Sequence, residues 1–202
     1  MNEQKILFIQ KRRNFMRDKK NDLDQAAYEV FSENGYKNTN ISAIVKRAGI
    51  AVGSFYNFYQ SKEEIFLNVY VKENDRVRNQ LIEQIDWKSE PATVIDQLFD
   101  YTLQAISNNK ILNEWNKSNI SKTLHDYYSG AGVKSYNFHH FLLKKFEEWL
   151  NKGNFSEEEK KKVLKVYSLI YYIDTHLSER DFDGYNETLG VLVKYFVRGL
   201  FS

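Results

Sequence analysis

A single proline, Pro91, in a chain of 202 residues is the feature that most restricts the fold. Only nine glycines accompany it, and an all-β sandwich or barrel requires many more turn-forming residues at regular intervals. Hydrophobic residues make up 42% of the chain, which is enough to bury a sizeable core and excludes a disordered chain. The sequence therefore predicts an all-α protein built from long helices.

Apolar residues recur at helical spacing between short polar breaks along the chain. The first clear amphipathic helix ends near Gly35 and contains Leu23, Ala26, Ala27, Val30 and Phe31. The helices expected after it cover about residues 39–48, 52–59, 61–86, 89–107, 133–150, 156–178 and 183–201. Residues 108–132 follow no clear pattern, and about nine helices are expected in all.

Three helix starts carry recognisable capping residues. Thr39 is the expected N-cap of the short helix that follows it. Ser61 with Glu64, and Ser156 with Glu159, have the spacing of a capping box. Proline is tolerated in a first helical turn, so Ser89-Glu90-Pro91 also predicts a helix start.

The formal net charge of +2 conceals an uneven distribution. Residues 1–62 contain 11 Lys and Arg against 6 Asp and Glu, a balance of +5, and residues 63–202 contain 18 against 21, a balance of −3. Seven of the basic residues lie within the first 20 positions. Two interpretations are open: a polyanion binds at this end, or the basic segment is an ordinary solvated tail.

Several classes of protein are disfavoured. The chain has no cysteine, which excludes disulfides, thiolate zinc sites and cysteine nucleophiles. No G-x-S-x-G or phosphate-binding glycine loop occurs, and adjacent His139 and His140 point about 100° apart on a helix. We therefore expect no enzyme, no cofactor and no metal site.

Neither a membrane span nor a secretion signal is expected. The longest apolar run, residues 189–201, is interrupted by Lys194 and Arg198 and is shorter than the about 20 residues of a spanning helix. The first basic residues mostly follow the short apolar patch, which is the reverse of a signal peptide. We expect a cytoplasmic protein, and 21 Lys against 8 Arg is typical of an AT-rich bacterial genome.

Residues 39–62 predict a helix-turn-helix. The first helix buries Ile44 and Val45, and Gly49 supplies the positive φ that the turn requires. The second helix buries Phe55 and Tyr59, which leaves its other face for a DNA groove. An ordinary helical hairpin without nucleic acid is the alternative.

Residues 20–68 resemble the DNA-binding domain of the tetracycline-repressor (TetR) family of transcriptional regulators. The resemblance is carried by Phe31, Gly35, Tyr36, Thr39, Ile44, Ala48, Gly49, Gly53, Tyr56, Tyr59, Lys62 and Glu63. The chain departs from the family pattern at Asn40, Val45, Ala51 and Tyr59.

The resemblance implies where DNA binds. Thr39, Tyr56 and Lys62 are expected on phosphate oxygens, which sets the register on the duplex. Ala51, Val52, Ser54 and Asn57 are expected at base edges in the major groove. The full set of expected DNA-binding residues is Thr39, Lys46, Ala51, Val52, Gly53, Ser54, Tyr56, Asn57, Phe58 and Lys62. The basic N-terminal arm is expected on the backbone or the minor groove.

The last helix is apolar almost all round, which indicates burial on more than one side. One interpretation is a central helix in a monomeric core. The resemblance implies a homodimer formed by the last two helices, and Gly190 and Gly199 are expected to permit close helix approach.

Aromatic side chains with polar tips crowd residues 90–180, which suits either a plain core or a pocket for a small molecule. The resemblance implies an effector pocket there. Its candidate residues are Trp115, Tyr127, Phe138, Phe141, Trp149, Tyr171 and Asp174. Asp174, an acid in an apolar run, is either satisfied within the core or available to a ligand.

The sequence thus predicts two domains: a DNA-binding domain over residues 1–62, and an effector-binding and dimerisation domain over residues 63–202. The expected function is a transcriptional regulator, with repression as the expected mode. It binds a palindromic double-stranded DNA operator as a homodimer and is released by a small effector. The alternative is an all-α ligand-binding or interaction protein that keeps the helix-turn-helix only as a scaffold.

Overall fold

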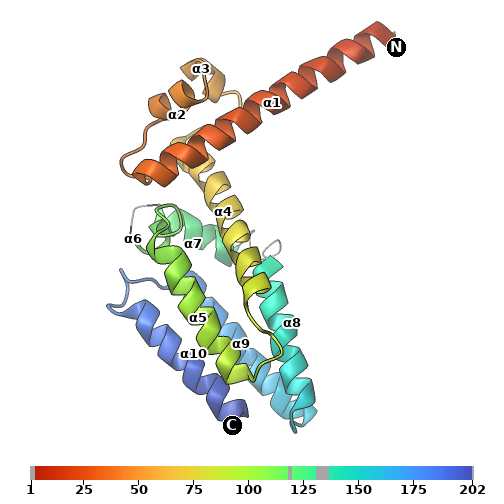
Figure 1. Ribbon diagram of the computed structural model, residues 1–202, viewed down its shortest axis with the longest axis vertical. Helices are drawn as coiled ribbons and strands as arrows, with labels where there is room; N and C mark the ends of the chain where they lie inside the picture. Colours follow the sequence, from red (N-terminus) through yellow and green to blue (C-terminus); the bar gives the residue numbers. More distant parts are fainter. Residues whose placement is uncertain (1–2, 118–119, 131–136, 202) are drawn as a thin grey trace. The chain divides into compact units, whose positions relative to one another are not determined.

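The structure is a computed structural model that describes the backbone of residues 3–117, 120–130 and 137–201 (Figure 1). All regular structure in those ranges is helical, which confirms the all-α prediction. The helices are α1 Glu3–Asn34, α2 Ile41–Arg47, α3 Val52–Phe55, α4 Lys62–Gln84, α5 Pro91–Ser107, α6 Glu114–Lys117, α7 Ser121–Ser129, α8 Asn137–Lys152, α9 Glu157–His176 and α10 Tyr185–Phe201.

Ten helices are described, so the expected count of about nine was slightly low. The short helices α6 and α7 lie within residues 108–132, where the sequence pattern predicted no helix. Helix α3 ends at Phe55, earlier than the expected Tyr59, and single turns continue through Tyr59. The first part of the helix expected at residues 133–150 lies outside the described residues, which resume at Asn137.

The basic N-terminal segment forms the first half of α1 and is not an irregular arm. Its residues, mainly Lys, Arg, Gln, Leu and Ile, include many good helix formers. They lack a clean apolar stripe, so a search for amphipathic periodicity misses them. This half of α1 extends past α2 and α3 (Figure 1).

Of the three expected caps, one forms in full, one forms in part and one is wrong, and the helix start expected at Pro91 is confirmed. Ser156 and Glu159 make both bonds of a capping box, and Pro91 lies in the first turn of α5. Ser61 accepts from the Glu64 amide, but the Glu64 carboxylate accepts from Gln60 and not from Ser61. The cap of α2 is Asn40, whose Oδ1 accepts from the Ala43 amide at 2.9 Å. Thr39 is instead buried.

The chain divides into two compact units, residues 1–72 and 73–202, so the boundary lies within α4 and beyond the expected Lys62. In the first unit, α1, α2, α3 and the start of α4 surround one core. Its fully buried side chains include Leu23, Ala27, Phe31, Ile44, Phe55, Ile65 and Phe66.

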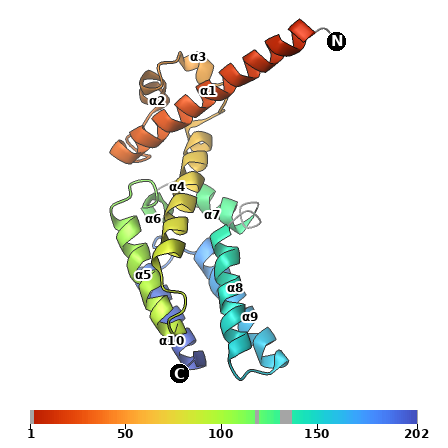
Figure 2. The same ribbon diagram turned by 45° about the vertical axis from the view of Figure 1, so that its right-hand side comes forward.

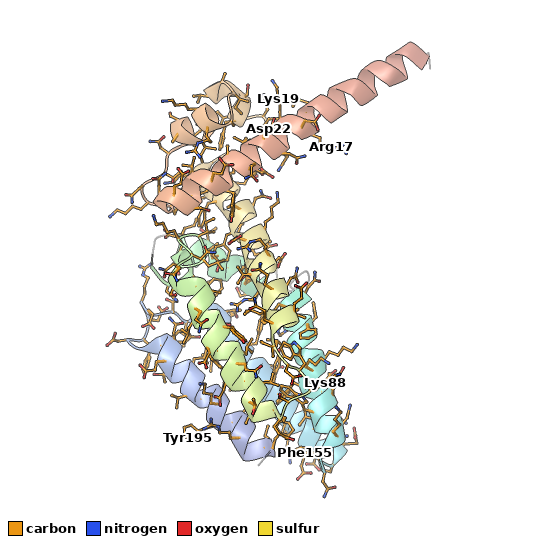
Figure 3. All side chains as sticks on the ribbon, viewed as in Figure 1. Arg17, Lys19, Asp22, Lys88, Phe155 and Tyr195 are labelled. Atoms are coloured by element: carbon orange, nitrogen blue, oxygen red, sulfur yellow. The ribbon has the colours of Figure 1, made fainter. Side chains whose placement is uncertain are left out.

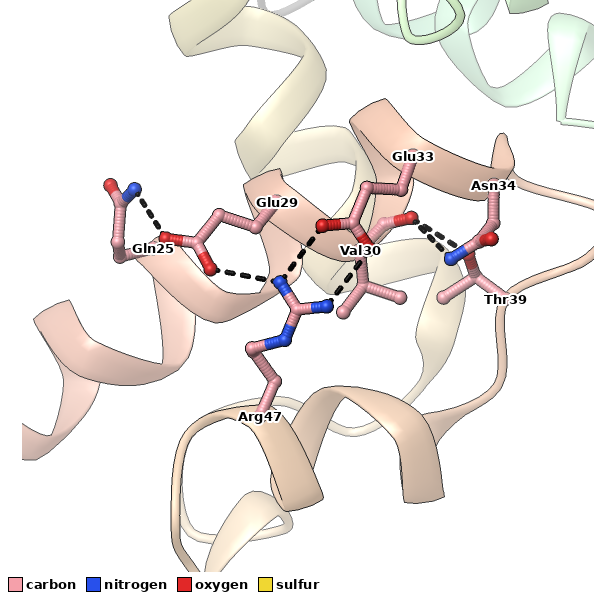
Figure 4. A network of polar contacts seen from close by, with 7 residues as sticks. All are labelled: Gln25, Glu29, Val30, Glu33, Asn34, Thr39 and Arg47. Atoms are coloured by element: carbon pink, nitrogen blue, oxygen red, sulfur yellow. Dashed lines mark hydrogen bonds and ion pairs between the residues drawn. The ribbon is translucent and has the colours of Figure 1, made fainter.

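An ion-pair cluster ties α2 to α1 at the surface of this unit (Figure 4). The Arg47 guanidinium donates to both carboxylate oxygens of Glu33, at 3.0 and 2.8 Å, and to Glu29 at 3.1 Å. Gln25 donates to the other oxygen of Glu29 at 3.0 Å. Because these groups are solvated, the cluster orients α2 more than it stabilises the fold.

A second polar cluster lies at the end of the helix-turn-helix, around the buried Asp24. Its carboxylate accepts from Lys72 at 2.6 Å, from Lys20 at 3.2 Å and from the Tyr59 hydroxyl. Burial alone would raise the pKa of Asp24, but these hydrogen bonds outweigh it and hold the pKa below its usual value. The cluster joins α1, α4 and the segment after α3.

In the second unit, α4 from Glu73 onward, α5, α8, α9 and α10 run alongside one another (Figure 2). One core cluster is formed by Leu81, Ile85, Val94 and Phe138, and another by Ile95, Phe146, Leu150 and Val197. None of the described helices has the length and apolar character needed to cross a bilayer.

Helix α10 packs on α5 through one face only. Asp96 on α5 pairs with Lys194 at 3.1 Å and with Arg198 at 2.9 Å. A Cβ added at Gly190 would lie 3.5 Å from the Phe99 ring, an ordinary van der Waals contact, and a Cβ at Gly199 meets nothing within 4 Å, so packing within the described chain requires neither glycine. The opposite face of α10 is exposed, so within the described chain α10 is not an enclosed central helix.

We expect Asp24→Asn to lower the free energy of unfolding at neutral pH by about 1–3 kcal/mol, because the amide leaves charged donors without their acceptor. The folded-state pKa lies below the unfolded value, so the stabilisation is present above about pH 4 and is lost as the pH falls through the folded-state pKa. Urea denaturation of both proteins at several pH values measures the difference.

Asp22→Asn is the matched control, because Asp22 is an exposed residue of the same helix (Figure 3). A stability difference between Asp24→Asn and the unsubstituted chain that grows toward acid pH would contradict this account of the cluster.

Candidate functional site

The turn between α2 and α3 is built as the sequence predicts. Gly49 adopts φ +67°, in the left-handed region that side chains disfavour. The Ala48 amide donates to Ile44 O at 2.9 Å and the Ile50 amide to Val45 O at 3.0 Å, which closes α2 and turns the chain. Phe55 and Tyr59 are buried, as expected for the inner face of the second helix.

The opposite side of this segment is an accessible surface. Val52 and Tyr56 are large side chains with 47% and 57% exposure, and Ala51, Gly53 and Asn57 are also exposed. Ser54 and Phe58 are half-buried. Lys46, in the last turn of α2, is exposed. We call the surface formed by Ala51, Val52, Gly53, Ser54, Tyr56 and Asn57, together with Lys46, the outer face.

Gly53 is not required by the packing of the chain. Its φ lies outside the left-handed region, and a Cβ built on it meets no atom within 4 Å. A helix interior favours alanine over glycine by roughly 0.5–1 kcal/mol. The absent side chain therefore gives the folded chain no stability, and it leaves open space on the outer face.

Two of the expected phosphate-binding residues are engaged within the chain. Lys62 Nζ donates to the carbonyl oxygens of Tyr36 and Thr39, at 3.0 Å each, and lies 4.0 Å from the centre of the Tyr36 ring. The Thr39 hydroxyl donates to Gly35 O at 2.7 Å (its link to Val30 is drawn in Figure 4). Lys62 and Thr39 thus connect the turn after α1 to the start of α4.

Tyr36 completes this connection, a role that sequence reasoning missed. Its hydroxyl donates to Glu63 at 2.6 Å, and this bond holds the pKa of Glu63 below its usual range. Tyr36 and Glu63 are 27 positions apart, so no local pattern pairs them. Their joint presence among the positions of the family resemblance was the only signal.

The basic residues of α1 divide into two groups. Arg17 is exposed and Lys19 half-exposed, and both lie on the part of α1 labelled in Figure 3. Lys20 is engaged with Asp24 and with the Tyr59 hydroxyl, the latter at 2.6 Å. The side chains of Lys5, Lys11, Arg12 and Arg13 lie outside the described set.

The candidate effector residues fall into different environments in the second unit. Phe141 packs edge-on against Trp87, and Trp149 packs against Phe146 and Phe201. Trp115 stacks on His125 with ring centres 4.0 Å apart, and Tyr127 meets Tyr128 edge-on. Phe138 is buried beneath the guanidinium of Arg78, and Tyr171 stacks on His139. Phe141 and Trp149 are thus explained by packing alone.

The remaining candidates lie near polar groups that sequence reasoning missed. Asn74 and Arg78, four residues apart on α4, together with Thr102 and Tyr128, form a hydrogen-bonded set next to Phe138 and Tyr171. Burial lowers the pKa of His139 to about 4, so this imidazole is neutral at physiological pH. No group of three potential metal ligands occurs among the residues that the structure describes.

Residues 25–69 match the family described as "Bacterial regulatory proteins, tetR family". The fatty acid metabolism regulator protein of Bacillus subtilis is 33% identical over 78 residues, which are 37% of this chain and 40% of that protein. The uncharacterised HTH-type transcriptional regulator YvdT of the same organism is 38% identical over 82 residues, 39% of this chain and 40% of that one. The chain thus spans less than half the length of the curated relatives that it matches.

Solved structures show the same fold at low identity. RolR in complex with resorcinol has a TM-score of 0.59 at 14% identity, over 93% of this chain and 89% of that one. Thermus thermophilus FadR in complex with lauroyl-CoA has a TM-score of 0.53 at 16% identity, over 90% and 95%. The similarity extends the architecture to the second unit.

The contacts of Lys62 lead to a prediction about stability. We expect Lys62→Met to lower the free energy of unfolding by about 1–2 kcal/mol, because two carbonyl groups lose a charged donor. Lys46→Met, the matched control on the outer face, should change it by less than about 0.5 kcal/mol. Urea denaturation measures both, and equal effects would show that the contacts of Lys62 do not support the turn.

Proposed function

We propose that the chain, whose residues 25–69 match the tetR family of bacterial regulatory proteins, is a transcriptional repressor that binds a palindromic operator as a homodimer. We also propose that a small effector bound in the second unit releases the DNA, and that the protein acts in the cytoplasm, where that DNA lies. The observation that carries the proposal is the outer face, with Gly53 at its centre.

The outer face has the chemistry of a major-groove reader. Asn57 is suited to a bidentate contact with adenine, and Ala51 and Val52 to thymine methyl groups. Tyr56, whose side chain is exposed, is suited to a phosphate oxygen, as is Lys46. Gly53 leaves room for the DNA backbone to approach the first turn of α3.

The exposed apolar faces of the last two long helices support the proposed homodimer. On α9 they comprise Val166, Leu169 and Tyr172, and on α10 Val191, Leu192 and Tyr195, which is 70% exposed and projects outward (Figure 3). Large exposed apolar surfaces mark interaction sites. A second copy is the fitting partner, since two-fold symmetry in the protein matches a palindrome.

Helix α4 is the proposed connection between ligand and DNA. It begins in the first unit, where Lys62 and Lys72 hold it, and continues into the second, where Asn74 and Arg78 join the polar set. In the DNA-bound dimer the two outer faces would be about 34–36 Å apart. An effector that favours a dimer with another spacing would release the operator.

Gly53→Ala tests the DNA interface. We expect unchanged or slightly higher stability, because alanine fits the helix, and about tenfold weaker operator binding, because the Cβ fills the space left for DNA. The operator is selected from a random duplex library, and affinity is measured by fluorescence anisotropy over a salt series.

Gly49→Ala is the opposite control, since strain at φ +67° should lower stability while the folded fraction keeps its affinity. If Gly53→Ala bound normally, the outer face would not be the DNA interface. If the affinity of the unsubstituted chain for DNA did not fall as the salt concentration rises, the scaffold alternative would be favoured.

Leu192→Glu tests the dimer. Leu192 is exposed, so we expect the fold to persist while the charge disrupts the contact between copies, shifting the chain from dimer to monomer in analytical ultracentrifugation at micromolar concentration. Operator affinity should fall as the dimer dissociates. Asn151→Glu, which places the same charge on an exposed position of α8, should leave the dimer intact, and a monomeric unsubstituted chain would refute the proposal.

A further inference from the structure

Two buried aromatic anchors fix the part of the outer face that follows α3. Phe55 is fully buried and Tyr59 is 5% exposed, and the Tyr59 amide donates to Phe55 O at 3.0 Å. Tyr56 and Asn57 lie between these anchors along the chain and are exposed. Because α3 ends at Phe55, the position of Asn57 depends on the anchor at each end of this single turn.

The second anchor carries a hydroxyl group that is held from two sides. The Tyr59 hydroxyl donates to Asp24 Oδ1 and accepts from Lys20 Nζ, the latter at 2.6 Å. Tyr59 is also one of the positions at which the chain departs from the family pattern. A phenylalanine would bury the same ring without a hydroxyl to satisfy, so burial of the ring does not explain the hydroxyl. The hydroxyl adds direction, since a hydrogen bond weakens steeply when its geometry changes.

Asp24 extends this contact to α4. Its Oδ2 accepts from Lys72 Nζ at 2.6 Å, while its Oδ1 accepts from Tyr59. Asp24 lies on α1 and is 8% exposed. One buried carboxylate therefore bridges the turn after α3 and the middle of α4.

Lys72 is followed directly by two residues with contacts in the second unit. Glu73 accepts from the side-chain amide of Asn109 at 2.6 Å, and Asn74 donates to the Tyr128 hydroxyl at 3.0 Å. Glu73 and Asn74 are both buried. Three consecutive residues of α4 thus hold groups of both units. Because adjacent residues of a helix move together, a displacement of this part of α4 changes both sets of contacts.

We propose that Asp24 is a positioning residue for operator recognition: through Lys72 and Tyr59 it sets the position of the outer face according to the position of α4. The inference rests on the proposed function, because it names the side chains through which α4 acts on the DNA contact. A displacement of α4 that draws Lys72 away from Asp24 loosens the hold on Tyr59. Asn57, two residues before Tyr59, then shifts with it.

Such a shift acts on sequence recognition more than on the general attraction to DNA. A bidentate contact of Asn57 with adenine requires donor–acceptor distances of about 3 Å. The attraction between basic side chains and phosphates extends over about 10 Å, the Debye length at roughly 0.1 M salt. Loss of the Asp24 contacts should therefore lower the affinity for the operator and leave the affinity for a random duplex almost unchanged.

Tyr59→Phe tests the contact without changing the charge of the chain. Affinities of the full-length protein for the selected operator and for a random duplex of equal length are measured by fluorescence anisotropy. We expect about tenfold weaker binding of the operator and less than about twofold change for the random duplex. Tyr28→Phe, a substitution of the same kind on α1, is the matched control and should change neither affinity.

Asp24→Asn separates positioning from electrostatics. Removal of a negative charge should by itself strengthen binding to both duplexes, whereas loss of the positioning contacts should weaken operator binding about tenfold. Circular dichroism at the assay temperature measures the folded fraction of each variant. A merely structural role would lower the melting temperatures of Asp24→Asn and Tyr59→Phe and leave the ratio of the two affinities unchanged, and that result would overturn the proposal.

A double variant tests the link to α4. Lys72→Met should weaken operator binding about tenfold in the unsubstituted chain but less than about threefold in the Tyr59→Phe chain, where the contact is already lost. Lys72→Arg, which keeps a charged donor, should retain most of the affinity. Equal losses in the two backgrounds would show that Lys72 acts independently of Tyr59 and would refute the link.

This inference and the proposed function fail in different ways. An unsubstituted chain that binds operator and random duplex equally would overturn the proposed function, and the assignment of Asp24 with it. An operator-binding chain whose affinity ratio is unchanged by Tyr59→Phe and Asp24→Asn would lose only the assignment of Asp24.

Discussion

Helix α3 is only four residues long, and its position depends on two aromatic side chains that hold it from the inside. A helix of one turn is not stable by itself, so the burial of Phe55 and Tyr59 must supply its order. Tyr59 is in turn fixed by the carboxylate of Asp24, which also accepts from Lys72 on α4. The positions of the outer-face residues are therefore defined by the core beneath them.

Both units satisfy buried polar side chains with groups of the chain itself. In the first unit, the buried carboxylate and the buried threonine are satisfied by groups of the chain itself, and the result is a rigid support. In the second unit, Glu73 is similarly satisfied by Arg76 and Asn109. The Tyr185 hydroxyl there, like Asn68 Nδ2 in the first unit, is buried without a hydrogen-bond partner among the described residues.

Local sequence signals were sufficient for most of the fold. Gly49, Pro91 and the pair Ser156 and Glu159 each have one physical reason to be where they are, and the structure confirms them. Thr39 and Asn40 are both good caps, and only the burial of Thr39 against Gly35 O decides between them. Helices α6 and α7 are too short for periodicity to show.

The candidate sites were less predictable, because their parts come from distant positions. The outer face is a continuous segment, so its residues could be named from the sequence. The hydrogen-bonded set in the second unit draws Arg78, Thr102 and Tyr128 from three helices, and no periodicity within one helix relates them. Tyr171, which donates to the Tyr128 carbonyl, was named from the sequence as one of the aromatic residues that crowd residues 90–180.

The unbroken course of α1 has a thermodynamic consequence. A basic segment that is disordered in the free protein loses conformational entropy when a polyanion orders it, and such ordering can consume about 2–5 kcal/mol of the interaction energy. In this chain the basic residues of positions 5–20 belong to a helix of 32 residues, about 48 Å long. Binding of a polyanion to this helix would therefore gain electrostatic free energy without the entropy loss of folding. The heat-capacity change on binding would also be much smaller than the change that coupled folding produces.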